Sequence, residues 1–399
     1  MSLTNTPNAN RLHIALYGRR NSGKSSLINA LTGQNTALVS EYAGTTTDPV
    51  YKAMELHPIG PVLFIDTAGF DDEGELGRLR VEKTEQAVAR TDMALVLLGE
   101  GEFSLEKQWI EKLKKRNIPV IAVINKIDIL RDVQALADRA QVELGQVPVC
   151  VSALKGEGIP TLREALVRAL PEDYERKSIT GELVNDGDLV MLVMPQDIQA
   201  PKGRLILPQV QTTRELLDKK CVIISTTADR YELALKQLAH APKLIITDSQ
   251  CFKQVYEHKP KESLLTSFSV LFAGYKGDIN AFVAGAAAID KLGPDSRVLI
   301  AEACTHAPLS EDIGRVKIPR ALRARYGEQM QIDIVAGVDF PKDLSPYDLV
   351  IHCGGCMFNR KYVLSRIEAA QAADVPITNY GVALAKLTGI LDKISFAGR

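Results

Sequence analysis

Short runs of apolar residues alternate along the chain with longer segments that are polar or amphipathic. In the first half, the apolar runs predict strands at 11–17, 62–65, 93–98, 120–124 and 147–151. Segments of helical length lie between them, and a Gly-rich turn leads from the first run into a helix that begins at Lys24. This alternation is typical of βαβ units, which have right-handed crossovers. We therefore expect an α/β protein that begins with a doubly wound parallel sheet.

A change in composition divides the chain further. Residues 171–188 are charged, contain Pro and Gly, and have few large apolar side chains, which indicates a linker. Beyond it, strand-like runs recur at 189–194, 222–225, 244–247, 297–301, 331–335 and 349–352. Helical patterns recur near 212–219, 228–238, 279–292, 313–326 and 360–373. We predict a first domain at 1–175, a small α/β domain at 189–265 and a parallel α/β domain at 266–399.

Composition narrows the class of protein. A length of 399 residues favours two or three domains. The net charge of −1 excludes a globally basic surface for nucleic acid. No apolar run approaches the roughly 20 residues of a membrane helix, and the polar N-terminus lacks a signal region. Six cysteines are too few for a disulfide scaffold. We expect a cytoplasmic protein that binds neither membrane nor nucleic acid.

A phosphate-binding loop follows the first predicted strand. The segment GRRNSGKS, residues 18–25, matches the P-loop pattern between a strand and a helix. The glycines Gly18 and Gly23 let the backbone wrap around phosphates, and the loop residue Ser22 and the helix residue Ser26 join the predicted contacts. Lys24 reaches the β- and γ-phosphates, and the Ser25 hydroxyl binds Mg²⁺. The alternative, a plain Gly-rich turn, does not account for this context.

Further motifs in order predict GTP as the nucleotide. Asp66 and Gly69 of DTAG end a strand, where the carboxylate can hold Mg²⁺ through water and the glycine N–H can approach the γ-phosphate. Between P-loop and DTAG, the segment GTTTD offers Thr46 as a second Mg²⁺ ligand. Later strand ends carry the predicted base-binding residues Asn125, Lys126, Asp128, Ser152 and Ala153. The Asp128 carboxylate pairs with guanine N–H groups that adenine lacks, so ATP is disfavoured.

These five elements resemble the TrmE–Era group of small GTPases. The motif GTTxD and an asparagine inside the P-loop, here Asn21, are typical of that group. The resemblance implies that Asn21 binds K⁺ and that K⁺ stimulates slow hydrolysis, with Lys24 and Thr46 as the other catalytic residues. Phe70 stands where related GTPases carry a water-orienting glutamine. Glu73 and Glu75 could position the water instead, although a solvated acidic loop is the simpler interpretation of both.

Three cysteines and two histidines follow two of the later strands. Cys304 and His306 follow the run at 297–301, and the segment HCGGC, residues 352–356, follows the next. Ligands in open α/β sheets bind at the carboxyl ends of strands. We therefore predict that Cys304, Cys353 and Cys356 bind an iron–sulfur cluster, since thiolates are its usual ligands. Structural zinc, a redox pair and buried apolar cysteines are the alternatives. His306 and His352 are candidates for a fourth ligand or for hydrogen bonding around the cluster.

A GTPase of this group joined to a CxH…HCxxC domain resembles the HydF family, the maturation GTPases of FeFe-hydrogenases. The resemblance covers the whole chain. It implies a homodimer formed by the middle segment, a 4Fe–4S cluster in the last segment, and a transient diiron precursor. Radical-SAM maturases supply this precursor, and apo-FeFe-hydrogenase receives it. The alternative function is that of a TrmE/Era-like GTPase in RNA modification or ribosome assembly with a structural zinc site.

Overall fold

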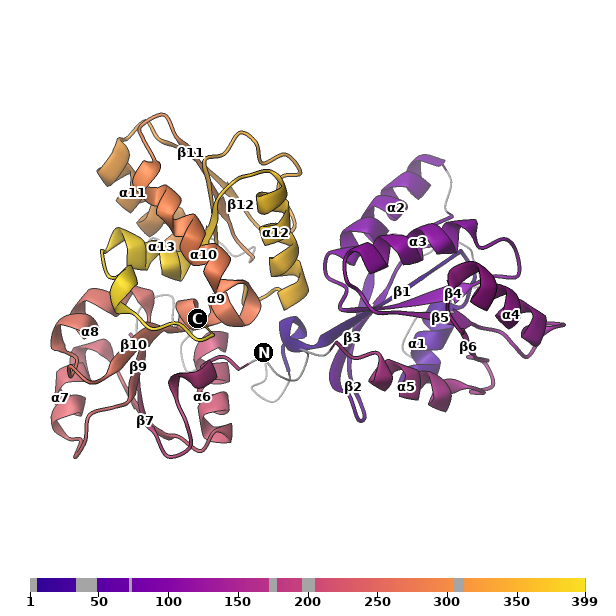
Figure 1. Cartoon of the computed structure of the whole chain (residues 1–399), viewed down its shortest axis with the longest axis horizontal. Coiled ribbons are helices and arrows are strands. Elements are labelled where there is room, and N and C mark those ends of the chain that lie inside the picture. The colour runs from indigo at the N-terminus through magenta and orange to yellow at the C-terminus, as the bar shows by residue number, and fades with distance from the viewer. Residues whose placement is uncertain are drawn as a thin grey trace. The chain divides into compact units, whose positions relative to one another are not determined.

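A computed structural model describes residues 6–33, 49–71, 74–171, 178–195, 205–303 and 312–398. The chain forms two compact units, Met1–Arg176 and Lys177–Arg399 (Figure 1). None of the helices in the described residues is long and apolar enough to span a lipid bilayer. The predicted mixed α/β fold with parallel sheets is confirmed.

The first unit contains one six-stranded sheet with helices on both faces. Its strand order is β2-β3-β1-β4-β5-β6, and only β2 runs antiparallel to its neighbour. The strands are β1 (Leu12–Gly18), β2 (Val50–Leu56), β3 (Gly60–Asp66), β4 (Met93–Leu98), β5 (Val120–Ile124) and β6 (Val149–Cys150). The helices are α1 (Lys24–Thr32), α2 (Gly74–Val88), α3 (Ser104–Lys115), α4 (Val133–Leu144) and α5 (Ile159–Arg168). The exposed edge strand β2 was not predicted.

Two apolar cores flank this sheet. Helices α1 and α5 cover one face, where Leu27 and Leu162 are buried, and α3 and α4 cover the other, where Trp109 is buried (Figure 1). Phe70, the residue after DTAG, stacks on Trp109 with ring centroids 5.7 Å apart. Its side chain therefore belongs to the core.

The second unit contains two four-stranded parallel sheets. The first has the order β10-β9-β7-β8 and is built from β7 (Leu189–Val193), β8 (Val222–Thr226), β9 (Leu244–Thr247) and β10 (Leu264–Ser267). Its helices are α6 (Leu207–Asp218), α7 (Tyr231–Lys236), α8 (Phe252–His258) and α9 (Phe268–Lys276). Helix α9 follows the predicted boundary at 265, and its residues Phe268 and Phe272 complete the core of this sheet.

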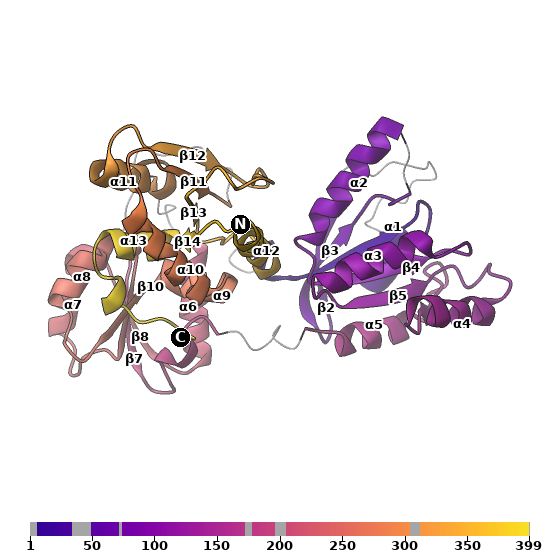
Figure 2. The ribbon, with the colours of Figure 1, turned by 45° about the horizontal axis from the view of Figure 1, so that its top comes forward.

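The second sheet of this unit has the order β12-β11-β13-β14. Its strands are β11 (Arg297–Ala301), β12 (Gln331–Val335), β13 (Leu349–His352) and β14 (Ile377–Asn379), and its helices are α10 (Ile279–Ala286), α11 (Ile318–Tyr326), α12 (Arg360–Ala372) and α13 (Tyr380–Leu387). Figure 2 shows α10 and α13 between the two sheets. After α13 the chain returns to the other sheet of this unit, where the Ser395 N–H donates to the carbonyl of Leu265 on β10 at 2.7 Å.

Candidate functional site

The P-loop connects β1 to α1, and its backbone packs closely against Asn125. Gly23 has a left-handed backbone (φ 88°), and a Cβ there would lie 2.4 Å from Asn125 Nδ2. The Lys24 ammonium group is buried and donates to the carbonyls of Gly18 (3.0 Å) and Arg19 (2.9 Å). The Ser22 hydroxyl is buried and has no hydrogen-bond partner among the described residues. A cation and a spare hydroxyl thus lie in one loop at a helix N-terminus, an arrangement suited to phosphate.

Two of the predicted Mg²⁺ residues, Ser25 and Asp66, meet at the same end of the sheet as the P-loop. The Ser25 hydroxyl donates to Asp66 Oδ2 at 2.5 Å, from the first turn of α1 to the end of β3. Burial raises the pKa of Asp66, whereas the hydrogen bond from Ser25 and the charge of Lys24 lower it. A Cβ at Gly69 would lie 2.8 Å from the Arg20 backbone nitrogen, so glycine allows the two loops to approach closely.

The base-binding motif is tied to the P-loop. Asn125 Nδ2 donates to the Ser22 carbonyl at 3.2 Å, and its Oδ1 accepts from the Ala153 N–H at 3.0 Å. Lys126 Nζ donates to the Asn21 carbonyl at 2.6 Å. The end of β5 is therefore bonded directly to the P-loop, and the segment after β6 is bonded to Asn125.

Asp128, at the end of the NKID motif, lies beside Ser152. The Ser152 hydroxyl donates to Asp128 Oδ1 at 2.7 Å, and this bond is the main reason that the pKa of Asp128 is lowered. An ionised carboxylate at this position accepts hydrogen bonds, as pairing with guanine requires.

The structure describes only some of the other predicted residues of this unit. Asn21 is exposed in a left-handed conformation (φ 57°), and Ser26 is half-buried on α1. Thr46, Glu73 and the side chain of Glu75 lie outside the part of the chain that the structure describes.

A second constellation lies where β11 and β13 end side by side. Ala301 is paired with His352, and the Cys353 N–H donates to the Ala301 carbonyl at 2.9 Å. Cys353 Sγ accepts two backbone hydrogen bonds, from Ala303 at 3.0 Å and from Gly355 at 3.4 Å. Such N–H donors stabilise a thiolate that binds a metal or cluster.

Without a metal ion, the protonated thiol is the favoured form of the Cys353 side chain. Burial raises its pKa to about 11, and the Gly355 N–H opposes this shift. Cys304 and His306 lie outside the described residues, although Ala303, next to Cys304 in the chain, contacts Cys353. Within the described ranges alone, three or more ligand-type side chains do not gather around one centre.

His352 lies in the core with both ring nitrogens engaged. Nδ1 lies 2.6 Å from the Cys353 carbonyl, and Nε2 lies 3.1 Å from Nη1 of Arg366, which is always a donor. Burial, then the charge of Arg366, lowers the pKa of His352 to about 3. Of the two roles that the sequence left open, this geometry favours hydrogen bonding that orients Cys353.

Sequence reasoning missed an acidic residue at the same edge. Glu302 follows β11 and is only 4% exposed, and its carboxylate pairs with Arg315 Nε and Nη2, both at 2.9 Å. Tyr380 donates to the other carboxylate oxygen at 3.4 Å. A carboxylate between an apolar run and a cysteine was the available signal in the sequence.

Three family models match consecutive parts of the chain. Residues 13–126 match the 50S ribosome-binding GTPase family, residues 179–277 match the hydrogen maturase F dimerization domain, and residues 280–395 match the hydrogen maturase F tetramerization domain. The first unit is a P-loop GTPase domain, and the two later matches are to self-association domains.

Curated relatives share part of the chain. The tRNA modification GTPase MnmE of Laribacter hongkongensis is 36% identical over 162 residues, which are 40% of this chain and 35% of that protein. GTPase Der of Hyphomonas neptunium is 37% identical over 171 residues, 41% of this chain and 33% of that protein. The chain therefore spans about a third of the length of these relatives.

Solved structures of GTPases also align. The alignment with an Aquifex aeolicus Era variant bound to GDP.AlF4− covers 54% of this chain and 92% of the Era chain, with 22% identity and a TM-score of 0.37. The alignment with NFeoB of S. thermophilus bound to GDP.AlF4− and K⁺ covers 39% of this chain and 61% of the NFeoB chain, with 27% identity and a TM-score of 0.33.

Proposed function

Since the chain belongs to the hydrogen maturase F family, we propose that it is a GTP-hydrolysing scaffold for FeFe-hydrogenase maturation. It holds a 4Fe–4S cluster, accepts a diiron precursor from radical-SAM maturases and transfers it to apo-hydrogenase. The observation that carries this proposal is the pair of backbone N–H donors on Cys353 Sγ, which lies after β13, next to the end of β11. A GTPase for RNA modification would not need this thiol arrangement.

The cluster ligands in this proposal are Cys304, Cys353 and Cys356. Three thiolates leave one iron with a non-thiolate ligand, to which an incoming diiron unit can bridge. His306 is the proposed ligand of that iron, whereas His352 acts through its hydrogen bonds. In the GTPase unit, Ser25 and Thr46 bind Mg²⁺ directly and Asp66 binds it through water.

The experiment that tests the proposed function is a transfer assay. Purified protein loaded with the diiron precursor is mixed with hydrogenase that lacks its diiron subcluster, and hydrogen evolution is measured. We expect hydrogen evolution above that of the unmixed hydrogenase. Absence of activation, with the cluster intact and loading verified, would return the protein to the general GTPase class.

We expect K⁺ to accelerate GTP hydrolysis by roughly tenfold or more over Na⁺ at equal ionic strength, because a cation beside the phosphates replaces an arginine finger. Asn21, exposed in the P-loop, is the proposed K⁺ ligand. Asn21→Ala should remove the difference between the two salts. The matched control is Asn117→Ala, since Asn117 is also exposed and left-handed (φ 52°) but lies after α3. Equal rates in both salts would exclude this role for Asn21.

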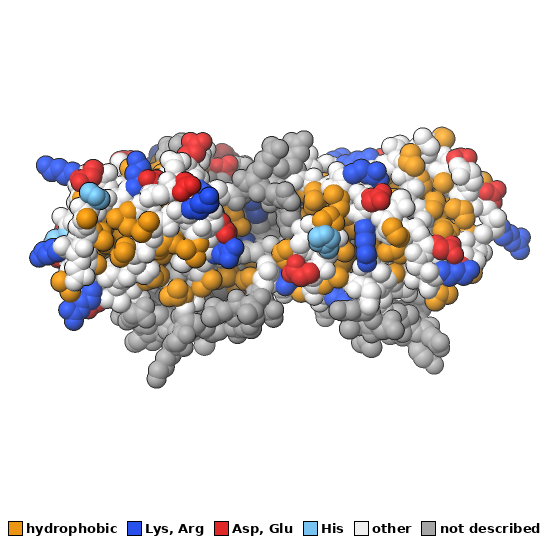
Figure 3. Space-filling view, turned by 90° about the horizontal axis from the view of Figure 1, so that it is seen from below, with side chains coloured by type: hydrophobic (Ala, Val, Ile, Leu, Met, Phe, Trp, Pro, Cys, Tyr) orange, Lys and Arg blue, Asp and Glu red, His pale blue; other side chains and the backbone are white. Residues whose placement is uncertain are grey.

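The proposed homodimer forms through the middle segment, 189–265. Among the described residues, strand β8 is an edge of its sheet, and Val222 on it is 54% exposed. Leu217 and Leu233 are also exposed, and Figure 3 shows hydrophobic side chains gathered on the face of this unit where β7 and α6 lie. The N–H of Val222 bonds to Asp188 beside β7, so the backbone groups of Ile223 and Ser225 face outward. Such an edge can pair with a second copy.

We expect Ser225→Pro to halve the mass of the assembly in light scattering. Proline removes an outward N–H from the edge and leaves the bonds to β7 in place. Ser225→Ala keeps the N–H and is the control. GTP hydrolysis should persist in both variants, since the first unit is untouched. A proline variant of unchanged mass would locate the interface elsewhere.

A further inference from the structure

A buried carboxylate lies in the GTPase unit outside every motif that the sequence analysis identified. Glu106 is in the first turn of α3, and its side chain is fully buried. Burying a carboxylate is costly unless a partner compensates its charge. The partner here is Arg19, whose Nε lies 2.8 Å from Glu106 Oε1 and whose Nη2 lies 3.2 Å from Oε2. Two hydrogen bonds of this kind fix the orientation of the guanidinium group in addition to pairing its charge.

Arg19 is the second residue of the P-loop, so the ion pair acts on the phosphate-binding loop itself. Its Nη2 also donates to the carbonyl of Glu102, just before α3, at 2.7 Å. The backbone carbonyl of the same arginine accepts from Lys24 Nζ at 2.9 Å and from the Ser22 N–H at 3.4 Å. One residue therefore connects α3 to the lysine that serves the phosphates.

Helix α3 is itself fixed to the sheet by an aromatic stack. Trp109, one turn after Glu106, is buried and stacks on Tyr17 of β1, with ring centroids 5.3 Å apart. Its ring also stacks on Phe70, whose N–H donates to the Gly18 carbonyl at 3.4 Å. The helix thus contacts the strand before the P-loop, the P-loop itself and the residue after DTAG. It is a packed support for both loops that meet the phosphates.

The geometry argues against a direct role of Arg19 on phosphate. An arginine that stabilises a transferring phosphoryl group turns its donors and its charge toward that group. Here Nε and Nη2 both bond to α3 and to the turn before it, and the Glu106 carboxylate compensates the charge. The hydrogen bond to Glu106 raises the pKa of Arg19, so the guanidinium group stays charged within the pair.

We propose that Arg19 and Glu106 are positioning residues for GTP hydrolysis, an inference that rests on the GTPase activity in the proposed function. Glu106 fixes the side chain of Arg19, and Arg19 in turn fixes the backbone carbonyl that receives Lys24. The pair acts through Lys24 and does not itself touch the nucleotide. Such support matters because a misplacement of about 1 Å in a catalytic group can lower a rate roughly a hundredfold.

The test removes both charges of the pair from the full-length protein. Arg19→Met alone would leave the Glu106 carboxylate buried without its counter-charge, which is expected to destabilise the fold. The double variant Arg19→Met, Glu106→Gln avoids this uncompensated charge and replaces each side chain with one of similar length. Release of phosphate is measured over a range of GTP concentrations, which gives kcat and KM separately.

We expect the double variant to lose activity in kcat and not in KM. The value of kcat should fall roughly tenfold to a hundredfold, because Lys24 is no longer held in line with the phosphates. The value of KM should change by less than about twofold, because the backbone of the loop still binds GTP.

The single tryptophan of the chain reports whether the fold around the pair is kept. Trp109 is buried against Tyr17 and Phe70, so its fluorescence emission shifts to longer wavelength if α3 leaves the sheet. A positioning role predicts a low kcat with an unchanged emission maximum. A low kcat with a red-shifted maximum would show that the pair only stabilises the fold, and would overturn the proposal.

The matched control is the double variant Arg11→Met, Glu55→Gln. Arg11 is buried and directly precedes β1, at the opposite end of this strand from the P-loop, and its Nη1 lies 3.6 Å from Glu55 Oε1. The control therefore removes another Arg–Glu pair from the same unit without changing a contact of Lys24. It should keep the kcat of the unaltered protein, and an equal fall in kcat would overturn the proposal.

The outcomes separate this inference from the proposed function. If the unaltered protein hydrolyses GTP and the Arg19→Met, Glu106→Gln variant has the same kcat, the positioning role is wrong and the GTPase function stands. If the unaltered protein hydrolyses no GTP, the GTPase part of the proposed function is overturned together with this inference.

Discussion

Replacing Lys24 with alanine is expected to reduce the turnover of GTP by roughly a hundredfold to a thousandfold or more, as the loss of a group that stabilises transition-state charge does. The Lys24 ammonium group is buried in the P-loop and bonds to two carbonyls of that loop. With nucleotide bound it follows the transferring phosphoryl group, and alanine supplies no charge there. Release of inorganic phosphate from GTP at saturating Mg²⁺ measures the effect.

Two comparisons make this prediction specific. Lys115→Ala removes an exposed lysine at the end of α3 and should leave the rate unchanged. The unaltered protein should hydrolyse GTP in strong preference to ATP, because adenine leaves the Asp128 carboxylate without its two hydrogen bonds. Equal hydrolysis of the two nucleotides would contradict the role of Asp128, and an active Lys24→Ala variant would contradict that of the P-loop lysine.

The sequence predicted the strands with continuous apolar runs and missed three that lack them. Strand β2 has the exposure pattern of a sheet edge, with Val50 and Tyr51 both exposed. Strand β10 (LLTS) contains only two large apolar residues and β14 (ITN) only one, which is too few for an apolar run. What decides these strands is pairing with distant neighbours, which a local pattern does not contain.

The GTPase motifs were predictable because each has a fixed place at a strand end. Asn125, Asp128 and Ser152 are distant in sequence from Ser22, and the sheet brings them to one edge. The orientation of His352 was not predictable. It depends on Arg366, which comes from α12 and is held by the Gly337 carbonyl and by the rings of Phe340 and Phe358.

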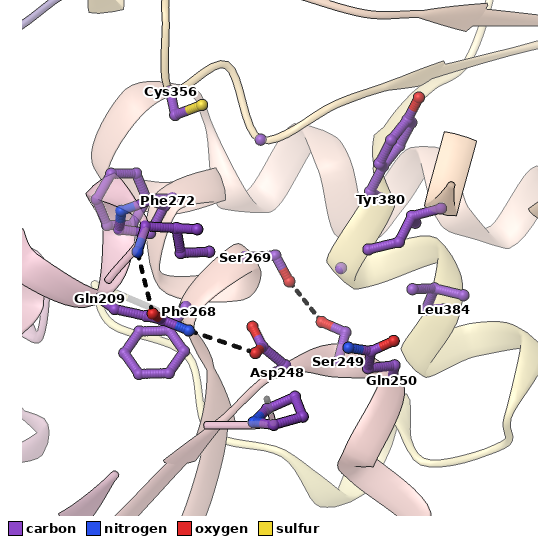
Figure 4. Close-up of a pocket in the computed structure, with 16 residues that line it drawn as sticks. Gln209, Asp248, Ser249, Gln250, Phe268, Ser269, Phe272, Cys356, Tyr380 and Leu384 are labelled. Carbon is purple, nitrogen blue, oxygen red and sulfur yellow. Dashed lines mark hydrogen bonds between the residues drawn. The ribbon is translucent and has the colours of Figure 1, made fainter. Parts of the chain in front are cut away.

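The middle segment carries no motif, so sequence reasoning assigned it only to dimerisation. Its polar residues Gln209, Asp248 and Ser249 line one cavity (Figure 4), and this cavity exists only because the two sheets of the unit face each other. Ser249 could have been flagged by its place after an apolar run. The facing sheet, with Tyr380 and Cys356, could not be inferred from that run.

Cys353→Ser is expected to lose most of the iron and to abolish activation of hydrogenase, while GTP hydrolysis persists in the first unit. Serine can still accept hydrogen bonds from the N–H groups of Ala303 and Gly355, which keeps the loop in place. Its hydroxyl, however, does not supply the soft thiolate that iron–sulfur clusters require. Iron and sulfide analysis after anaerobic reconstitution, together with electron paramagnetic resonance of the reduced protein, measures the loss.

The matched control lies in the same unit. Cys221 is buried, and its Sγ lies 3.4 Å from the Asn185 carbonyl, so Cys221→Ser keeps a hydrogen-bond donor and should retain the full iron content. A second comparison isolates His352. His352→Gln should leave iron bound, because His352 is tied to Arg366 and the Cys353 carbonyl, and should alter the spectrum through the position of Cys353. If Cys353→Ser keeps the iron and spectrum of the unaltered protein, the cluster is not at this strand end.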